Sequence, residues 1–317
     1  MFASLTYKSK HFWWLVLKLF VLILFGYFIY YTLTTNDQLD FNDFVQTLTT
    51  SKLFKPLTIV LLLTFTLCNW ILEITKWKVL TNSIQPTSWK EAMQQSLSSL
   101  TFSLITPNRI GEYGAKAIYF SREKRKSILL LNFIGNTHQL FVTVMIGVTT
   151  IYTLPAIIKQ EIPKTLYTVL DFIPAVLLVA LLLLNYNKRF AQWRERFSKQ
   201  FDFITKKLNV LIFGLSLLRY VIFSHQFYFL LIVFDVEISY WLALQAIAGM
   251  YLISSMIPML SLFDFVVKGS VAVTIFSLLG VSPLIILTIT TLMWILNFVL
   301  PAILGSYYVL TFKPVAT

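Results

Sequence analysis

The sequence predicts an all-α polytopic membrane protein with about six full spans and two re-entrant hairpins arranged as an inverted repeat. Of the 317 residues, 57% are apolar and 13% are charged, and the mean hydropathy is +0.74. Soluble domains average roughly 45–50% apolar and about 25% charged residues. The apolar residues also gather in runs close to the ~20 residues that cross a bilayer. A water-soluble protein is therefore excluded, and residues 1–317 are expected to form one transmembrane domain.

The expected elements follow the apolar runs along the chain. Residues 12–31 form a run that is longer than a signal-peptide core and lacks a small-residue cleavage site, so we expect an uncleaved anchor helix. Residues 56–155 are interpreted as a first repeat, 166–186 as a linking span and 208–312 as a second repeat. The remaining runs within these units cover residues 56–75, 89–105, 127–154, 208–232, 238–257 and 284–312.

The distribution of charge predicts the orientation. The chain has 26 basic and 14 acidic residues, a net charge of +12. The basic residues gather in short loops, where they set topology, so no nucleic-acid partner is expected. Loops 76–90, 109–126 and 187–207 carry three, six and seven basic residues against none, two and two acidic ones, and are predicted to be cytoplasmic. Loop 33–55 and the connection around Asp235 are predicted to lie outside. Both termini then face the cytoplasm, and we expect the cytoplasmic membrane of a bacterium.

The first hairpin follows from this orientation. The chain is predicted to be cytoplasmic both before Trp89 and after Ser121, so the segment between them must enter the membrane and return. Pro107 and Gly111 interrupt the helix at its tip. Non-helical backbone at this depth is tolerated only where protein or a water-filled cavity satisfies its polar groups. The alternative is an amphipathic helix on the cytoplasmic surface, because the segment is rich in polar residues.

The second half shows a similar plan. An apolar arm, 238–257, leads to Pro258 and then to a short arm, 269–281, whose thirteen residues are too few to span a bilayer. A hairpin here would enter from outside.

Each turn is followed by a carboxylate four residues before a lysine: Glu112 and Lys116 in the first half, Asp264 and Lys268 in the second. Two halves of opposite orientation are the inverted repeat of many transporters, which bind their substrates near the midplane. The alternative is chance similarity, because acid–base pairs at this spacing are common.

The chain also resembles a known family. The run Thr106-Pro107-Asn108-Arg109-Ile110-Gly111-Glu112, followed by a basic loop, resembles the first signature of the lysylphosphatidylglycerol synthase transmembrane region, the flippase-like part of the multiple peptide resistance factor. The Ile257-Pro258 turn and Leu278-Leu279-Gly280-Val281 resemble its second signature. The resemblance covers roughly residues 12–312 and implies lipid handling or translocation.

Two departures from the family pattern bear on the substrate. The family usually has a basic residue three positions after the acid, whereas this chain has Ala115 there and Lys116 one position later. Its second motif is usually glycine-rich before an Arg-Glu pair, whereas residues 260–264 read Leu-Ser-Leu-Phe-Asp. The larger synthase also carries a soluble aminoacyl-transferase domain. We expect none here, because the chain ends at Thr317.

Polar residues inside the membrane are expensive and indicate function. Arg219 lies in the middle of its apolar run, where it can bind a lipid phosphate bidentately or pair structurally with Asp264 or Glu112. On the span from Ser127, a polar stripe is explained either by a site or by interhelical hydrogen bonds. Its members are Asn132, Asn136, Gln139 and Thr143.

Other polar and aromatic residues are interpreted as structural. Glu73 lies near a predicted helix end and is expected to reach the interface. Gln245 and Gly249 share a face on which close packing is the expected role. The tryptophans near predicted boundaries are interpreted as interface anchors: Trp13, Trp14, Trp70, Trp77 and Trp89.

The residues predicted to form a lipid-binding or translocation site share a place at a hairpin or inside a span. Glu112 and Asp264 are expected to lie deep and within about two helix diameters, ~20 Å, of each other. Each acid is expected to be partly neutralised by its own lysine one turn on, and the lysines to be free to meet a lipid phosphate as it passes. The set is Pro107, Arg109, Gly111, Glu112, Lys116, Asn136, Arg219, Pro258, Asp264 and Lys268.

No catalytic, cofactor or metal motif is visible, and neither Cys68 nor the three dispersed histidines suggest a disulfide or a metal site. We keep two hypotheses: a lipid transporter or flippase for an anionic phospholipid or polyprenyl-phosphate lipid, and a membrane-embedded lipid-modifying transferase or its accessory subunit. The transferase would use Glu112 or Asp264 as a base. A third, a structural scaffold, predicts that neither acid faces a cavity.

Overall fold

The fold was obtained as a computed structural model, which describes residues 51–103, 110–153, 201–257 and 264–312, with isolated residues at 46, 48, 49, 106 and 168. The predicted anchor helix 12–31 and linking span 166–186 lie outside the described residues, as do Pro107, Arg109 and Pro258.

The described residues are helical and contain no strand. Within the described ranges, three helices and one interrupted helix are long and apolar enough to cross a membrane: α3, α6, α10 and the run 283–311. The elements in order are η1 (Lys52–Phe54), α3 (Pro56–Asn82), α4 (Trp89–Ser103), α5 (Ile110–Ala117), α6 (Arg125–Thr153), α10 (Lys206–Val233), α11 (Tyr240–Ser255), α12 (Asp264–Ser277), α13 (Pro283–Trp294), the π-helix η3 (Ile295–Val299) and α14 (Leu300–Thr311).

Local sequence explains where several helices begin. Pro56 and Pro283 occupy first-turn positions, where their missing N–H is not needed. Before α4, the Ser88 hydroxyl accepts from the Glu91 N–H while the Glu91 carboxylate accepts from the Ser88 N–H, which is a capping box. Ser239 caps α11 by accepting from the Leu242 N–H.

Two predicted boundaries were wrong. Helix α3 continues to Asn82 rather than ending near residue 75, because the charged residues at that point are paired and buried within the protein. Helix α12 begins at Asp264, five residues before the predicted arm, and ends at Ser277.

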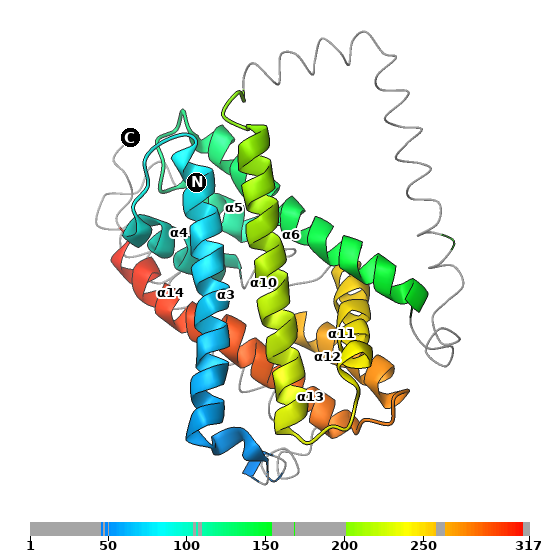
Figure 1. The fold of residues 1–317 in the computed structure, drawn as a ribbon. Coiled ribbons are helices and arrows are strands. Elements are labelled where there is room, and N and C mark those ends of the chain that lie inside the picture. Colours follow the sequence, from blue (N-terminus) through cyan, green and yellow to red (C-terminus); the bar gives the residue numbers. More distant parts are fainter. Residues whose placement is uncertain are drawn as a thin grey trace.

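Helices α3 and α10 lie side by side and run in opposite directions at the centre of the molecule (Figure 1). Helix α6 and the run from α13 to α14 cross this pair obliquely, with α4 and α5 on one side and α11 and α12 on the other (Figure 1). The first arm α4 packs on α14, and α11 packs on α6. The short arms α5 and α12 pack on α6 and α13.

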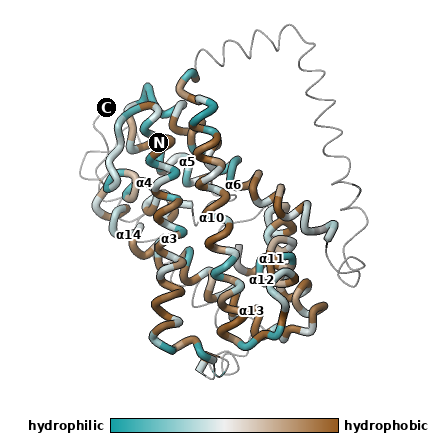
Figure 2. Tube along the Cα trace, in the orientation of Figure 1, coloured by the Kyte–Doolittle hydropathy of each residue, from teal (hydrophilic) through white to brown (hydrophobic). Residues whose placement is uncertain are grey.

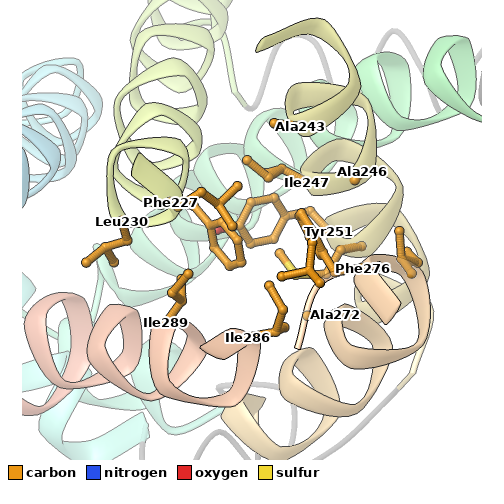
Figure 3. Packing of buried hydrophobic residues seen from close by; sticks show 14 of the residues in the cluster. Phe227, Leu230, Ala243, Ala246, Ile247, Tyr251, Ala272, Phe276, Ile286 and Ile289 are labelled. Atoms are coloured by element: carbon orange, nitrogen blue, oxygen red, sulfur yellow. The ribbon is translucent and has the colours of Figure 1, made fainter. Parts of the chain in front are cut away.

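The largest buried apolar cluster lies where α10, α11, α12 and α13 meet. Phe227, Ile247, Phe276 and Ile289 converge there from the four helices (Figure 3). In contrast, large apolar side chains remain exposed on the outer faces of the long helices; Leu57 is 70% exposed. Figure 2 shows hydrophobic residues along these helices and hydrophilic ones concentrated at their ends and in the connections. This distribution is typical of helices in contact with lipid.

Polar contacts join connections that were predicted to lie on the same side. Lys52, before α3, forms an ion pair with Asp235, after α10. At the other end, the Lys124 ammonium donates to Gln85 Oε1 at 2.6 Å. The predicted outer connections thus meet at one end of the molecule and two predicted cytoplasmic loops meet at the other.

Candidate functional site

A network of buried polar side chains lies where α3 and α10 cross. Asn69 is the middle residue of α3, with thirteen residues on each side, and Arg219 has thirteen residues before it in α10 and fourteen after it. At 1.5 Å per residue, each lies ~20 Å from either end of its helix. The network therefore lies near the middle of the two spans.

Arg219 is held by α3. Its Nη1 lies 2.7 Å from Glu73 Oε2, and its Nε donates to Asn69 Oδ1 at 2.9 Å. The Lys76 ammonium lies 2.7 Å from the same Glu73 oxygen. The Arg219 side chain is 16% exposed, so the ion pair is largely shielded from solvent.

Glu73 is thus a residue whose role the sequence interpretation missed. It was expected to reach the interface, but it is buried, and it is the acidic partner of Arg219 that neither predicted pairing named. Asn69 and Glu73, four residues apart, lie on one helical face, which was a readable signal.

Asn297, in the π-helix η3, joins the network from a third side. It accepts from Asn69 Nδ2 at 2.8 Å and donates to Gln226 Oε1 at 2.8 Å. Gln226 is fully buried and donates to Thr66 Oγ1 and to the Leu62 carbonyl. This chain of amides ties α3, α10 and η3 together. Asn297 was not predicted, although a lone amide inside an apolar span is a functional signal.

The π-helix has a visible cause. Pro301 follows Asn297 by four residues and has no N–H, so it cannot donate to the Asn297 carbonyl. The Trp70 indole Nε1 donates to that carbonyl instead, at 3.1 Å. π-Helical turns of this kind are frequent at functional sites.

A second buried group lies beside the first. The Lys116 ammonium donates to Glu112 Oε1 at 2.7 Å and to Asn132 Oδ1 at 2.8 Å, and lies 4.1 Å from the centre of the Trp77 ring. Glu112 and Lys116 are each 2% exposed. The predicted pairing of Glu112 with Lys116 is confirmed, and the burial of Glu112 is consistent with its predicted depth. Lys116 also contacts Asn132 on α6 and Trp77 on α3, so the expectation that it is free was wrong.

The tryptophans of α3 were also wrongly interpreted as interface anchors. Trp70 and Trp77 are 8% and 1% exposed, and the Trp77 indole donates to Gln95 Oε1 on α4 at 2.7 Å. Buried indoles require such an acceptor. Trp89 is 47% exposed at the start of α4, as an anchor would be. Trp13 and Trp14 lie outside the described residues.

Three members of the polar stripe of α6 form interhelical hydrogen bonds, whereas the fourth, Thr143, donates to the Gln139 carbonyl of its own helix. Besides Asn132, Asn136 donates to the Tyr113 hydroxyl at 3.4 Å and Gln139 donates to the Ser216 carbonyl at 3.3 Å. These contacts match the structural explanation of the stripe. Gln245 makes a comparable bond, donating to Thr153 Oγ1 at 3.1 Å.

Helices α11 and α12, predicted as the two arms of the second hairpin, have a different environment. Lys268 is a partly buried residue whose ammonium lies 5.9 Å from the Tyr251 ring centre, and Tyr251 packs edge-to-face on Phe223. Asp264 begins α12, but its side chain lies outside the described residues. The predicted approach of Asp264 to Glu112 stays a prediction.

Gly111 lies where a close approach to α4 leaves no room for a Cβ. Its N–H donates to Thr106 Oγ1 at 2.8 Å, and a Cβ added there would lie 2.6 Å from the Phe102 carbonyl oxygen. It brings the start of α5 against the end of α4. No cluster of His, Cys, Asp or Glu suited to a metal occurs among the residues that the structure describes.

Long apolar helices around a buried ionic network define an integral membrane protein with a polar centre. The family of the lysylphosphatidylglycerol synthase transmembrane region matches residues 13–305, and the chain belongs to this family. No curated protein matches the chain significantly.

Proposed function

We propose that this protein binds an anionic lipid headgroup at the buried ionic network and moves it across the membrane. The observation that carries the proposal is the combined net charge of two neighbouring groups, the one around Arg219 and the one around Lys116, which together form the buried ionic network. Among the described residues, the buried carboxylates are Glu73 and Glu112, and the cations beside them are Lys76, Lys116 and Arg219. The group thus has one more positive charge than negative charges.

The excess charge favours a monoanionic ligand. An excess charge inside a membrane is expensive, and it is tolerated where it serves a function. A single phosphodiester would neutralise the network, whereas a zwitterionic headgroup would bring a further cation. Phosphatidylglycerol-type lipids therefore fit best. A polyprenyl phosphate offers the same oxygen chemistry.

Arg219 is the residue best suited to hold the phosphate. A guanidinium forms planar, bidentate bonds with phosphate oxygens as it does with carboxylates. In the structure the Glu73 carboxylate takes this place, at 2.7 Å. Binding would then exchange Glu73 for phosphate at Arg219, while Lys76 keeps Glu73 paired.

The arrangement of the helices supports an inverted repeat of two hairpins around this site. Helices α4 and α11 follow capping serines, Ser88 and Ser239, and are too short to span a bilayer, with 15 and 16 residues. In this proposal the protein has six spans, including residues 12–31 and 166–186, with both termini in the cytoplasm of a bacterium.

The transferase hypothesis has less support. It needs a free carboxylate as a base, and Glu112 Oε1 accepts a bond from Lys116. An accessory role beside a membrane enzyme is compatible with the same lipid site.

Translocation can be measured in proteoliposomes that contain phosphatidylglycerol labelled with a dithionite-quenchable fluorophore on its acyl chain. The full chain should raise the fraction of label that dithionite can reach, and phosphatidylcholine with the same label should not respond. Arg219→Leu should abolish the effect and Arg219→Lys should keep part of it. Lys207→Leu is the matched control, because Lys207 is exposed on the same helix.

A second measurement addresses binding alone. Anionic lipids should co-purify with the wild-type protein in mild detergent, as detected by native mass spectrometry, and should be lost from Arg219→Leu. The proposal is overturned if labelled phosphatidylglycerol moves no faster than in protein-free vesicles and no anionic lipid co-purifies.

A further inference from the structure

Two glycines allow unusually close contacts between helices. A Cβ added to Gly305 of α14 would lie 2.2 Å from the Leu97 carbonyl oxygen and 2.5 Å from Thr101 Oγ1, both on α4. A Cβ added to Gly147 of α6 would lie 2.5 Å from Leu252 Cβ on α11. Real Cβ atoms cannot occupy such positions, so glycine is required at both.

The two contacts occupy the same positions in the two halves of the chain. Helix α6 and the run from α13 to α14 both have 29 residues, and each glycine is the twenty-third residue. Leu97 and Ala248 are the ninth residues of α4 and α11; the Ala248 carbonyl oxygen lies 3.2 Å from the Gly147 Cβ position. Thr101 and Leu252 are the thirteenth. One packing arrangement is thus built twice from different residues.

Each contact joins one half of the chain to the other. Helix α4 belongs to the first half but packs on α14, and α11 belongs to the second half but packs on α6. The Thr101 hydroxyl also donates to the Ala302 carbonyl at 3.0 Å across the first contact. The short arms α5 and α12 instead pack on α6 and α13 of their own halves.

We infer that Gly147 and Gly305 are equivalent positioning residues that fix the first arm of each hairpin to the opposite half. The halves are therefore interlocked and do not rock apart as two bodies. If the protein translocates lipid as proposed above, the moving parts are the short arms α5 and α12. These arms carry Glu112 and Lys116 in the first half and Lys268 in the second.

Disulfide cross-linking in the full chain tests which contacts must open. In a Cys68→Ser background, Thr101→Cys with Ala302→Cys joins α4 to α14, and Val144→Cys with Leu252→Cys joins α6 to α11 at the equivalent positions. Oxidation should leave phosphatidylglycerol translocation unchanged for both pairs. Tyr113 and Asn136 meet through the ends of their side chains, too far apart for a direct disulfide, so Tyr113→Cys with Asn136→Cys is bridged by a short bis-methanethiosulfonate reagent. This bridge joins the short arm α5 to α6 and should stop translocation, which reduction of the bridge should restore. Loss of translocation on oxidation of either of the first two pairs overturns the inference.

The positioning role has a readout that does not depend on transport. Gly147→Ala and Gly305→Ala should lower the melting temperature and slow formation of the disulfide at their own interface. Gly214→Ala should do neither, because a Cβ at Gly214 meets nothing within 4 Å. If the wild type moves no lipid but the glycine variants behave as expected, the proposed function fails and the interlock stands. If all three variants behave alike, the interlock fails.

Discussion

The Glu73 carboxylate has two cations at 2.7 Å, one from its own helix and one from α10. Removing a charge from water is costly, so a buried ion pair is costly to break from one side. The two sides are not equivalent here. Without Arg219, Glu73 keeps Lys76, whereas without Glu73 the two cations remain beside each other.

This asymmetry predicts a difference between two variants in which a charged side chain is replaced by neutral glutamine. Glu73→Gln should lower the free energy of unfolding by about 3–5 kcal/mol, because it leaves adjacent buried cations unpaired. Arg219→Gln should cost less, because a neutral Glu73–Lys76 pair remains. Denaturant titration of the purified proteins in detergent would measure both. Equal losses for the two variants would contradict the charge arrangement described above.

At the scale of the elements, a glycine allows the start of α5 to approach the end of α4. Gly111→Ala should lower the free energy of unfolding by about 1–3 kcal/mol, since the new methyl group would meet the Phe102 carbonyl. Gly114→Ala on the same helix has no neighbour within 4 Å and should be neutral or slightly stabilising. Thermal unfolding of the two variants provides the comparison. A larger loss for Gly114→Ala would be inconsistent with this close approach.

The capping box of α4 predicts a dependence on pH. The Ser88 backbone N–H and hydroxyl lower the pKa of Glu91 below its usual value. A lowered pKa in the folded state contributes stability above the unfolded pKa of about 4.3, and the contribution disappears as the pH falls through the folded pKa. Because Glu91 is exposed, the contribution is below about 1 kcal/mol.

Glu91→Ala should therefore melt below the wild type at neutral pH, and the two melting temperatures should converge below about pH 4. Lys90→Ala, an exposed neighbour, is the control and should show no such convergence. A constant difference between Glu91→Ala and the wild type across this range would rule out the carboxylate as the cause.

The sequence predicted the helices well and the network only in part. Hydropathy located α3, α6, α10 and the last span, because lipid contact requires long apolar runs. A hydropathy pattern scores each charged residue on its own and contains no information about ion pairs. The prediction therefore ended α3 before Lys76 and placed Glu73 at the membrane interface. The partner of Glu73 lies on α10, about 150 residues later in the chain, and no local pattern records that distance.

For the whole molecule, the proposed topology can be tested by labelling exposed residues at the start of each first arm. In a Cys68→Ser background, Lys90→Cys should react with an impermeant thiol reagent only from the cytoplasm, and Trp241→Cys only from outside. Both native side chains are exposed. Labelling of both positions from the same side would eliminate the inverted arrangement and with it the opposed hairpins.

The contact between α4 and α14 also has a consequence for synthesis. Thr101 and Ala302 are separated by 201 positions in the chain. At ~5–20 residues per second, a ribosome needs roughly 10–40 s to make that length. During this interval α4 is in or beside the bilayer without the helix that covers it, and its Gln95, Ser96 and Ser99 side chains, buried in the finished protein, lack their final surroundings. The nascent first half is thus the stage at which a membrane chaperone or a quality-control protease can recognise the protein.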